Sequence, residues 1–536
     1  MMNILNQELA TYGLGSSTMQ VLTAEDNAEE YDQARQVFNR RFDLRPWAIV
    51  FPENNLDVRQ MVLLASKSNR EIRVKGGGHD HEGECSANGA LLLDMSKLKN
   101  LSFGAFNDKP VANIGVGWIF KDLIVPLVAA GVSIPHGTCQ TVGITGFTLG
   151  GGWGPWTRKY GMCCEHLTGA TIILGDGSIK HLRLDSHKAE DRNLLWALRG
   201  GGGFSYGIVT ELQIATFELP DNAHKFEAVW TTQPALKVLT GWEQAIEAKS
   251  NPELVGTNLQ ILAKPRQASV LDDDYIKKSV HECHFFGYYL GDKAAVEQAI
   301  AAWFPDVPPD YLEVIEDSDS SHLQFSSWGR VLHSQRCSLS LQGNLRLNAQ
   351  HDFPLEEDIP APHKISSRLV NPEGLGEQGR INLIRSLESD LLHAEGEQLG
   401  VIAYVTLGAI SGSFYCDYSD RFAENAAFPD NLGSAFPYKD RPYTIQYQVW
   451  WDTKSSISPT ESELAGVNVY TNRAMDWIAQ CRRADFPQTS GAFISFKDAD
   501  IATETYFLQN YENLVDVKRT ASQDPLNRFR SRKTII

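Results

Sequence analysis

The sequence is poor in cysteine, and its basic residues are outnumbered by acidic ones. Its 536 residues include eight cysteines, too few for a fold held together by disulfides. The neighbours Cys163 and Cys164 are badly placed to bridge each other, so we expect reduced thiols. Lys and Arg total 49 against 66 Asp and Glu, a net charge of -17, which argues against a nucleic-acid-binding surface and against binding to anionic membranes.

Long apolar runs are also missing. No uncharged apolar stretch approaches the ~18 residues needed to span a bilayer, and residues 1–20 lack a basic start followed by an apolar core. We therefore expect no membrane-spanning segment and a cytoplasmic location. No internal repeat and no low-complexity segment is evident.

Two common nucleotide-binding motifs are missing from the most glycine-rich part of the chain. The pattern G-x-x-x-x-G-K-[ST] does not occur, which argues against an NTPase. No G-x-G-x-x-G occurs in the glycine-rich residues 135–161, so this stretch does not form a Rossmann fingerprint. Any nucleotide must be bound in another way.

Two kinds of pattern divide the chain, and its length exceeds what one core usually serves, so we expect two domains. From about residue 40 to 215, short apolar runs such as AIVFP and ATIILGDG alternate with amphipathic stretches such as NLDVRQMVLLASKSN, which is typical of a mixed α/β domain. From about 220 to 480, longer alternating runs such as GVIAYVTLGAISG and YTIQYQVWWD predict half-buried strands of an antiparallel sheet.

Helices and loops are predicted beside these strands. The stretches DKAAVEQAIAAWF and SPTESELAGVNVYTNRAMDWIAQCR have helical patterns, and so does ETYFLQNYENLVDVKRTA near the end of the chain. The Pro-rich residues 352–364 predict a surface loop.

A glycine triplet at 76–78 follows the strand-like run EIRV. Three consecutive glycines let the backbone turn freely and bring N–H groups close to an anion such as a pyrophosphate, although a simple tight turn is the alternative interpretation. A metal site is a second alternative, because four candidate ligands lie within seven residues: His79, His81, Glu82 and Cys85. Ligands at this spacing in a glycine-rich turn rarely converge without a second cluster, so we predict no metal.

A second glycine-rich stretch surrounds Cys139. Residues 137–161 contain eight glycines, which leave many N–H groups unobstructed, as a loop along a phosphate-bearing cofactor requires. A thiolate there would be a good nucleophile toward an electron-poor ring, whereas a lone cysteine is more often a small buried apolar side chain. A third glycine run, at 200–203, lies between a helix-like and a strand-like segment and again permits close approach to a planar or phosphorylated ligand.

Taken in this order and spacing, these segments resemble the flavoproteins of the vanillyl-alcohol oxidase and p-cresol methylhydroxylase superfamily, and specifically the berberine-bridge-enzyme-like branch. Four motifs carry the resemblance: a basic residue then x-G-G-H at 75–79, G-x-C-x-x-V-G-x-x-G at 137–146, G-G-G-x-G at 150–154 and L-x-W-A-x-R-G-G-G at 194–202. Residues 506–529 also follow the family's closing pattern, Y-x-x-x-N-Y-x-x-L-x-x-x-K…D-P-x-N-x-F. The resemblance is strong over about 45–215, good over the last forty residues and limited to general pattern in between.

The resemblance implies an α+β fold. An FAD-binding domain of the p-cresol methylhydroxylase type would be built in two parts, residues 1–218 and 486–536. The inserted substrate-binding domain, residues 219–485, would be built on an antiparallel sheet flanked by helices.

The resemblance also implies FAD bound covalently at two points, with the flavin 8α-methyl group on His79 and the C6 atom on Cys139. In the family, double attachment raises the oxidising power of the flavin and opens the cleft for bulky substrates. Substrate hydride passes to flavin N5, a side-chain base takes a proton, and dioxygen usually reoxidises the flavin to give hydrogen peroxide. The remaining cofactor-binding residues that the family pattern implies are Lys75, Gly76, Gly77, Gly78, Asp80, Gly137, Thr138, Val142, Gly143, Gly146, Gly151, Gly152, Gly161, Gly207, Val209, Asn510 and Tyr511.

The sequence departs from the family at the usual positions of the catalytic base. The tyrosine of a Y-x-N motif is replaced by Phe493, the tyrosine of G-G-G-Y-G by Trp153, and the histidine of F-P-H by Tyr438. The strand 443–448, which holds a glutamate base in some relatives, contains no acid. Because loss of a general base costs roughly 10²- to 10⁴-fold in rate, another residue, water or the substrate must take the proton.

Two strands supply our candidates for catalytic residues. Period-two geometry puts Thr444, Gln446 and Gln448 on one face of their strand, from which Gln446 would orient a substrate by hydrogen bonds. Tyr404 is the best remaining proton acceptor, although a tyrosine needs a neighbouring cation or the reduced flavin to act as a base near neutral pH. A strand aromatic that merely packs is the alternative interpretation.

Aromatic residues favour an apolar substrate. Trp153, as the third candidate, would form an apolar pocket floor with Phe493, and Trp328, Trp450 and Trp451 would enrich the cleft. We therefore predict an oxygen-dependent oxidase of a small hydrophobic or aromatic natural product in secondary metabolism, oxidising an alcohol, an amine or an activated ring C–H, with cyclisation as an optional further step.

Several alternatives stay open from the sequence. They are an oxidase of a sugar or oligosaccharide hydroxyl, a flavin dehydrogenase with another acceptor, a flavin-bearing binding protein without turnover, and a zinc-dependent hydrolase built on His79, His81 and Cys85. The expected partners are a small-molecule substrate and dioxygen, with no nucleic acid and no membrane, and the oligomeric state is left open.

Overall fold

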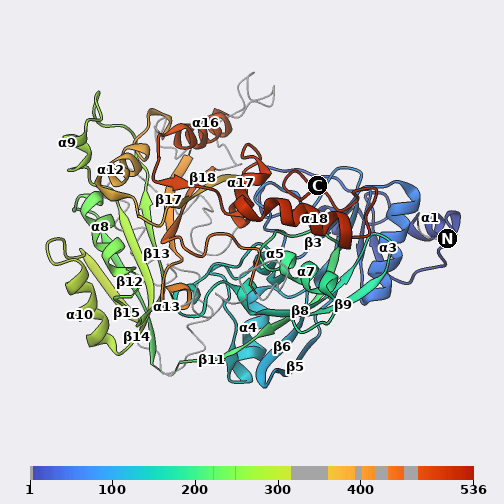
Figure 1. Cartoon of the computed structure of the whole chain (residues 1–536). Helices are drawn as coiled ribbons and strands as arrows, with labels where there is room; N and C mark the ends of the chain where they lie inside the picture. Colours follow the sequence, from blue (N-terminus) through green and yellow to red (C-terminus); the bar gives the residue numbers. More distant parts are fainter. Residues whose placement is uncertain are drawn as a thin grey trace.

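The computed structural model describes residues 4–220, 222–247, 249–315, 360–392, 401–416, 433–451 and 469–536. Within these residues, three β-sheets of four, five and eight strands form the framework, and helices lie beside them (Figure 1). The smaller two sheets come from the first half of the chain, and the large sheet lies next to them. This arrangement confirms the predicted α+β fold.

The first sheet supports the glycine triplet. Strands β2 (Ala48–Phe51), β4 (Leu91–Asp94) and β3 (Ile72–Lys75) run parallel, and β1 (Gln20–Leu22) is antiparallel at the edge. Helix α3 (Asn55–Ser68) connects β2 to β3; the Asn54 side chain accepts from two backbone N–H groups at its start, and Asn69 ends it in the left-handed conformation. Because β3 ends at Lys75, the triplet begins at the carboxyl end of a partly buried strand.

The second sheet is antiparallel and supports the other two glycine runs. Its strands, in spatial order, are β5 (Leu101–Phe106), β6 (Lys109–Gly115), β10 (Ile208–Ala215), β8 (Leu167–Ile173) and β9 (Ile179–Arg183). Four helices and a small two-stranded sheet lie beside it: α4 (Phe120–Ala129), α5 (Ile144–Leu149), α6 (Thr157–Tyr160), α7 (Ala189–Leu198), and β7 (Val132–Ser133) with β11 (Phe217–Glu218). Residues 202–207 lead directly into β10, at the centre of the sheet.

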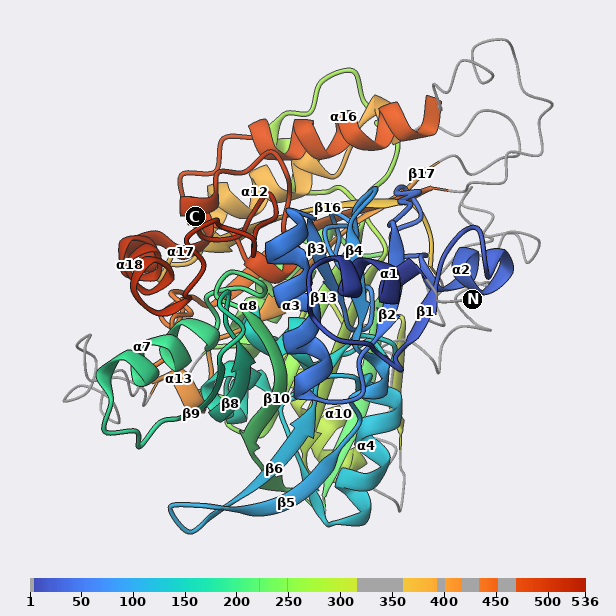
Figure 2. The same ribbon diagram turned by 90° about the vertical axis from the view of Figure 1, so that its right-hand side faces the viewer.

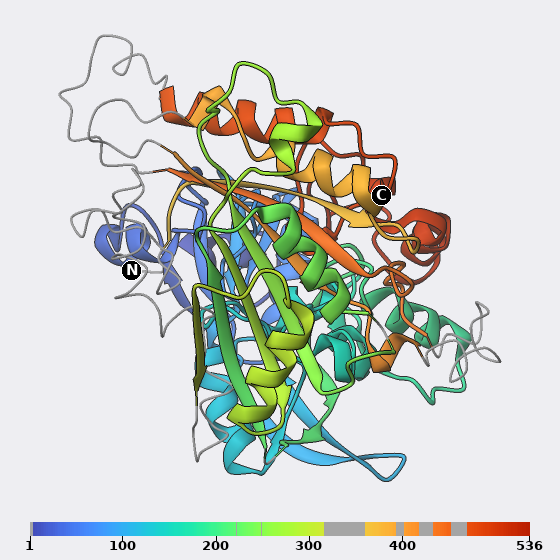
Figure 3. The same ribbon diagram turned by 90° about the vertical axis from the view of Figure 1, so that its left-hand side faces the viewer.

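The large sheet is antiparallel throughout and presents one face to the first half of the chain. Its order is β15 (Tyr311–Ile315), β12 (Ala223–Trp230), β14 (Cys283–Leu290), β13 (Leu254–Leu262), β17 (Val401–Ala409), β18 (Tyr443–Trp451), β16 (His363–Val370) and β19 (Thr489–Ser490). Helices cover the opposite face, as Figure 3 shows: α8 (Ala235–Ala245), α9 (Asp273–Ile276), α10 (Lys293–Trp303), α12 (Gly376–Ser386) and α16 (Val469–Arg483). The short helix α13 (Ser413–Cys416) follows β17.

Strand β17 corrects the expectation of half-buried strands. Every residue of β17 is buried. Its apolar residues, such as Val405 and Leu407, pack into the core under the helices, while Tyr404 and Thr406 are covered from the other side by the first half of the chain. The alternating pattern therefore marks a strand with two covered faces, one apolar and one polar.

The end of the chain returns to the first core. Leu514, Phe529 and Ile535 belong to the same apolar cluster as the first two sheets. Helix α18 (Tyr511–Ala521) lies beside α7 (Figures 1 and 2). The single helix predicted for this segment is wrong, because Leu508 adopts a φ of 45° and a 3-10 turn at 508–510 separates α17 (Thr503–Phe507) from α18.

Most other predicted elements are confirmed within the described residues, with one further correction. Residues 352–359 of the predicted Pro-rich loop lie outside the described residues, but His363 and Lys364 begin strand β16 and are buried. The domain limits at 218 and 485 stay a prediction; the strands of the large sheet run from Ala223 to Ser490. None of the described helices is both long and apolar enough to cross a membrane.

A buried ion-pair cluster joins three separate parts of the chain. The Lys364 ammonium on β16 pairs with Glu82, which follows the first glycine loop, and lies 2.7 Å from Oδ1 of Asp498 near the end of the chain. These three side chains are at most 2% exposed. Arg41 pairs with Glu82 at 3.0 Å, and Arg482 with Asp498 at 2.9 Å. Each charge is paired, which is the condition under which buried ions are tolerated.

Replacing Lys364 by methionine should destabilise the protein by about 3–5 kcal/mol, because two buried carboxylates lose their shared cation. The free energy of unfolding from urea titration measures this. Burial raises the pKa of Asp498, but Lys364 outweighs it and the net pKa is lowered. The stabilisation is therefore present above the ordinary carboxyl pKa, and the difference between wild type and variant should shrink as the pH falls below about 4.

The matched control is Lys97→Met, since Lys97 pairs with Glu53 at 2.8 Å at the surface, with the side chains 35% and 61% exposed. We expect a cost of about 0–1 kcal/mol there. Equal losses in the two variants would contradict a special role for the buried cluster.

Candidate active site

A cavity of about 480 Å³ lies between the glycine loops and the large sheet. One side is formed by residues 76–81 after β3, by much of 137–150, by 202–204 and 207 before β10, and by 208–209 at the start of β10. The other side is formed by side chains from β13, β14, β16, β17 and β18, and residues 494–497 complete the lining. Segments far apart in the sequence therefore meet around one partly open cavity.

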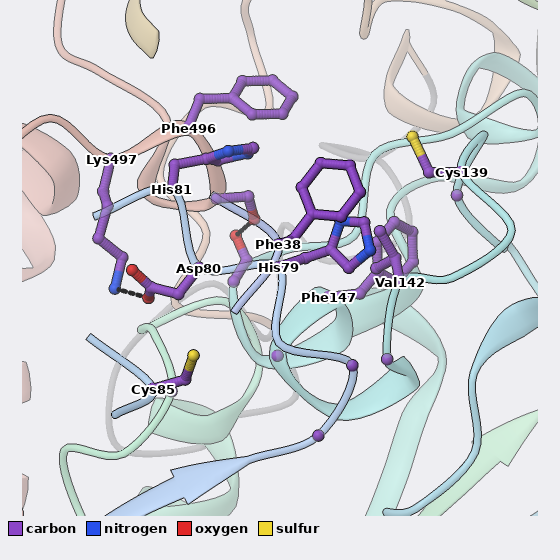
Figure 4. A pocket seen from close by; sticks show the side chains of 18 of the residues that line it. Phe38, His79, Asp80, His81, Cys85, Cys139, Val142, Phe147, Phe496 and Lys497 are labelled. Carbon is purple, nitrogen blue, oxygen red and sulfur yellow. Dashed lines mark hydrogen bonds and ion pairs between the residues drawn. The ribbon is translucent and has the colours of Figure 1, made fainter. Parts of the chain in front are cut away.

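The first two glycine loops are in backbone contact. A Cβ atom on Gly77 would lie 2.4 Å from the Gly143 nitrogen, and one on Gly143 would lie 2.5 Å from the Gly77 nitrogen. No other residue fits at either position without separating the loops. This contact brings His79 from one loop and Cys139 from the other to the same cavity (Figure 4).

The His79 ring is fixed from two directions. It stacks on Phe38, with ring centroids 3.8 Å apart, and its Nε2 lies 2.7 Å from Oγ1 of Thr141. Burial lowers the pKa of His79 to about 3, with a smaller contribution from His81. The imidazole is therefore neutral at physiological pH, and one ring nitrogen carries a lone pair that can act as a nucleophile.

The glycine loops leave space for a ligand. A Cβ on Gly146 would meet no atom within 4 Å, and one on Gly76 would meet only the Val116 carbonyl at 3.9 Å, although both glycines line the cavity. Neighbouring protein does not require glycine there, but a cofactor lying against the backbone would. The residues present, with free backbone along the loops and an imidazole and a thiol at the cavity, fit the FAD that the sequence resemblance implies.

Most of the predicted cofactor-binding residues line the cavity. They are Gly76, Gly77, Gly78, His79, Asp80, Gly137, Thr138, Cys139, Val142, Gly143, Gly146, Gly207 and Val209. The other six lie outside the lining: Lys75, Gly151, Gly152, Gly161, Asn510 and Tyr511. Lys75 instead pairs with Asp94 at 2.9 Å, and the Asn510 amide donates to the Ala435 carbonyl. Cofactor contact by any of these residues stays a prediction.

The wall formed by the large sheet combines amides with aromatic rings. The Tyr404 hydroxyl donates to Oε1 of Gln448 and accepts from Nε1 of Trp450, both at 3.0 Å. The Gln448 amide in turn donates to Oγ1 of Thr406 at 3.2 Å. Gln446 lines the cavity from the same strand as Gln448, as the period-two pattern predicts. This network fixes the side chains that a substrate would meet.

Trp153, the third catalytic candidate, also lines the cavity, and its Nε1 donates to the Ala409 carbonyl at 2.7 Å. Phe493 does not form a pocket floor with it, because it packs behind the lining against Gly151 and Phe436. Thr444 is likewise absent from the lining.

Of the tryptophans expected in the cleft, Trp450 lines the cavity, whereas Trp451 points into the core beneath the helices. Neighbouring residues on a strand face opposite sides of the sheet, so only one of this pair can reach the cavity. Trp328 lies outside the described residues.

Sequence reasoning missed several lining residues. Phe38 carries no motif, and its stacking on His79 could not be inferred from the sequence. Lys497 was missed too: its ammonium lies 2.6 Å from Oδ2 of Asp80, and although burial lowers its pKa, the Asp80 carboxylate outweighs this and raises it. The sequence also missed Asn258 and Gln260 on β13 and Phe286 on β14. It does not show how these two strands pair, and therefore not which of their residues meet at the cavity.

The metal alternative finds no supporting geometry. Glu82 is engaged by Lys364 and Arg41, and burial raises the pKa of the Cys85 thiol to about 12, which disfavours the thiolate that a metal would require. Within the part of the chain that the structure describes, no three His, Cys, Asp or Glu side chains are arranged to hold a metal ion.

Comparison with known proteins gives two matching family models. Residues 46–183 match the model described as FAD binding domain, and residues 492–536 match the model described as berberine and berberine like. The matches fall on the first glycine loops and on the returning end of the chain, which contribute to the same cavity.

Individual proteins are similar over part or all of the chain. Glucooligosaccharide oxidase of Sarocladium strictum is 34% identical over 228 residues, which cover 41% of this chain and 44% of that protein. The structure of berberine-bridge-enzyme-like protein 1 from Physcomitrella patens covers 100% of this chain and 99% of its own, with a TM-score of 0.73 and 21% identity. A glucooligosaccharide oxidase structure from Acremonium strictum, concerned with its 6-S-cysteinyl, 8α-N1-histidyl FAD, covers 99% of both chains with a TM-score of 0.71 and 20% identity.

The family models therefore match two of the segments that line the cavity, and the Physcomitrella patens structure shares the fold that the described residues show. This chain belongs to the berberine-bridge-enzyme-like FAD-linked oxidases of the vanillyl-alcohol oxidase and p-cresol methylhydroxylase superfamily.

Proposed function

We propose that the protein is an oxidase whose FAD is attached covalently at both His79 and Cys139. The observation that carries this proposal is that an imidazole and a thiol line one cavity, on two loops held in backbone contact at Gly77 and Gly143. The doubly attached FAD of the Acremonium strictum structure supports it. Bound FAD would accept a hydride from the substrate and pass the electrons to dioxygen, which gives hydrogen peroxide.

The chain's own residues would bind the cofactor and orient the substrate. The N–H groups of the glycine loops would hold the phosphates, and His79 and Cys139 would hold the ring system through covalent bonds. The Gln446 and Gln448 amides would then hydrogen-bond to polar groups of the substrate, and Trp153 would limit how deeply it enters.

The proposed substrate is a small hydrophobic or aromatic natural product of secondary metabolism. Rings line the cavity on both sides, with Phe286, Trp153 and Trp450 on the substrate side. Such rings favour a flat apolar substrate. The oxidised group would be an alcohol, an amine or an activated ring C–H, and cyclisation would follow where the substrate carries a second nucleophile.

A sugar or oligosaccharide hydroxyl is a second candidate substrate, and a specific observation favours it. The Oδ1 atom of Asn258 is buried in the cavity lining without a hydrogen-bond partner among the described residues. Gln260, Thr406 and the two glutamines of β18 add further polar groups to the same wall. A substrate rich in hydroxyl groups would satisfy them, and the partial match to glucooligosaccharide oxidase agrees with this.

Peroxide production distinguishes these substrates. We expect benzylic and cinnamyl alcohols to give kcat/KM values at least tenfold above those of cellobiose and chitobiose, because the ring-lined cavity favours flat apolar groups. Peroxide formation in air measures the oxidase reaction, and anaerobic bleaching of the flavin absorbance measures substrate oxidation separately.

The other outcomes contradict parts of the proposal. A preference for the disaccharides would make the protein a sugar oxidase, and bleaching without peroxide in air would make it a dehydrogenase with another acceptor. No bleaching by any alcohol, amine or sugar would indicate a flavin-bearing binding protein.

Thr141 would direct the attachment of the flavin to His79. The hydrogen bond to Thr141 occupies Nε2, and the stacking on Phe38 restricts ring rotation, so Nδ1 is the ring nitrogen left for a bond to the cofactor. The histidyl link of the Acremonium strictum FAD is through N1, which agrees with this orientation.

Replacing Thr141 by valine should lower the fraction of protein with a histidyl link at least tenfold, because the imidazole loses the hydrogen bond that orients it. The Cys139 link should persist. Thr141→Ser keeps the hydroxyl and should restore the histidyl link. Peptide mass spectrometry measures both links, and an unchanged histidyl link in the valine variant would contradict the role of Thr141.

A further inference from the structure

A hydrogen-bonded pair of histidines borders the cavity on the side of the large sheet. Nδ1 of His81 lies 3.0 Å from Nε2 of His363, and Nδ1 of His363 lies 2.9 Å from the Ala361 carbonyl oxygen. His81 lines the cavity, whereas His363, the first residue of β16, is completely buried behind it. Figure 4 shows His81 beside Phe496, close to His79 and Phe38.

The hydrogen bonds define the protonation of both rings. A carbonyl oxygen only accepts, so Nδ1 of His363 must donate to Ala361. Burial and the neighbouring charge of His81 hold the pKa of His363 well below its ordinary value, so His363 is neutral and its Nε2 carries a lone pair. That lone pair accepts the Nδ1 proton of His81, and the lone pair of a neutral His81 is therefore on Nε2.

Rings around the pair place it next to the cofactor attachment site. Phe38 stacks on His79 and meets His363 edge-on, with centroids 5.9 Å apart. Trp450 lies against His363 with centroids 4.2 Å apart, and its Nε1 donates to the Tyr404 hydroxyl. His81 thus lies among the residues that a substrate between the cofactor and the sheet would contact.

Tyr404, the acceptor predicted from the sequence, is less suited to take a proton. Its hydroxyl donates to Gln448 and accepts from Trp450, both of which are neutral. Neither of these two hydrogen-bond partners supplies the positive charge that stabilises a tyrosinate near neutral pH. Tyr404 is better placed to orient a substrate than to deprotonate it.

We propose that His81 is the proton acceptor of the oxidation and that His363 is a positioning residue that holds its Nε2 lone pair toward the cavity. The inference rests on the proposed oxidase function. For an alcohol, the C–H bond breaks and its electron pair leaves as hydride to the bound flavin, while the O–H bond breaks and its proton goes to Nε2 of His81. A C=O bond forms, and dioxygen takes up the two electrons with two protons to give hydrogen peroxide.

Charged and titratable groups around the two histidines determine the pH range in which His81 can accept a proton. Burial lowers the pKa of His81 to about 4, Asp80 and Glu82 raise it, and Lys497 lowers it. The surroundings of His363 add His79 and Arg41, which lower its pKa. His81 is therefore unprotonated above about pH 5, and its acceptor capacity falls as the pH drops toward 4.

Chemical modification tests the lone pair without measuring activity. Diethyl pyrocarbonate acylates accessible unprotonated imidazole nitrogens, so His81 of the flavin-loaded wild-type protein should be modified and His363 should not. Peptide mass spectrometry locates the adduct, and its rate should fall with a midpoint near pH 4. The exposed His187 is the internal control. An unmodified His81 beside a modified His187 would overturn the proposal, because a proton acceptor must be reachable from the cavity.

Variants test the role in the reaction with the best alcohol found. His81→Phe should lower kcat about 10²- to 10⁴-fold, the usual cost of losing a general base, while His187→Gln should leave kcat unchanged. His363→Phe should also lower kcat, whereas His363→Gln, whose amide oxygen can accept from Nδ1 of His81, should recover most of it.

The pH profile separates the two candidate acceptors. With His81, wild-type kcat/KM should be flat from about pH 5 to pH 9 and fall in acid, whereas a tyrosine base gives a rise toward pH 10. A wild-type rise at alkaline pH with unaltered kcat in His81→Phe would overturn the proposal. If no alcohol, amine or sugar bleaches the flavin, the oxidase function itself fails, and that result is distinct from any result of the modification experiment.

Discussion

The backbone contact between Gly77 and Gly143 is the constraint on which the candidate site depends. The two loops approach so closely that a Cβ atom at either position would overlap backbone atoms of the other. One loop carries His79 directly after its glycines, and the other carries Cys139 four residues before Gly143. The contact therefore brings an imidazole and a thiol from two separate sequence motifs to one cavity. Gly76 and Gly146, which line this cavity without close neighbours, would leave room for a bound cofactor.

The start of strand β16 connects this site to the large sheet. Lys364 pairs with Glu82 and Asp498, which ties the sheet to the first glycine loop and to the returning end of the chain. His363, its neighbour, holds His81 of the same loop. Adjacent residues of a strand point to opposite sides. Lys364 therefore ties the sheet to the glycine loop and the end of the chain, while its neighbour His363 orients His81 at the cavity. Stability and chemistry are thus coupled through the segment 79–82.

The sequence predicted those parts of the site that are encoded in a short motif or in the alternation of a single strand. The glycine motifs at 75–79 and 137–146 identified His79 and Cys139, and alternation identified the strands that carry Tyr404 and Gln446. What could not be predicted depends on contacts between distant segments. Burial of both faces of β17 needs the first half of the chain, and the break at Leu508 is a backbone conformation that a helical pattern does not reveal. The pairing of His81 with His363 joins residues 282 positions apart. From the sequence, His81 had instead been a candidate metal ligand.

Two covalent bonds to one flavin are the central claim, and tryptic peptide mass spectrometry of the purified protein tests them most directly. Trypsin releases His79 in residues 76–97 and Cys139 in residues 122–158. The account predicts one species that contains both peptides joined through FAD, with the mass unchanged by denaturation. Both peptides recovered unmodified, with all the flavin in the acid supernatant, would contradict it.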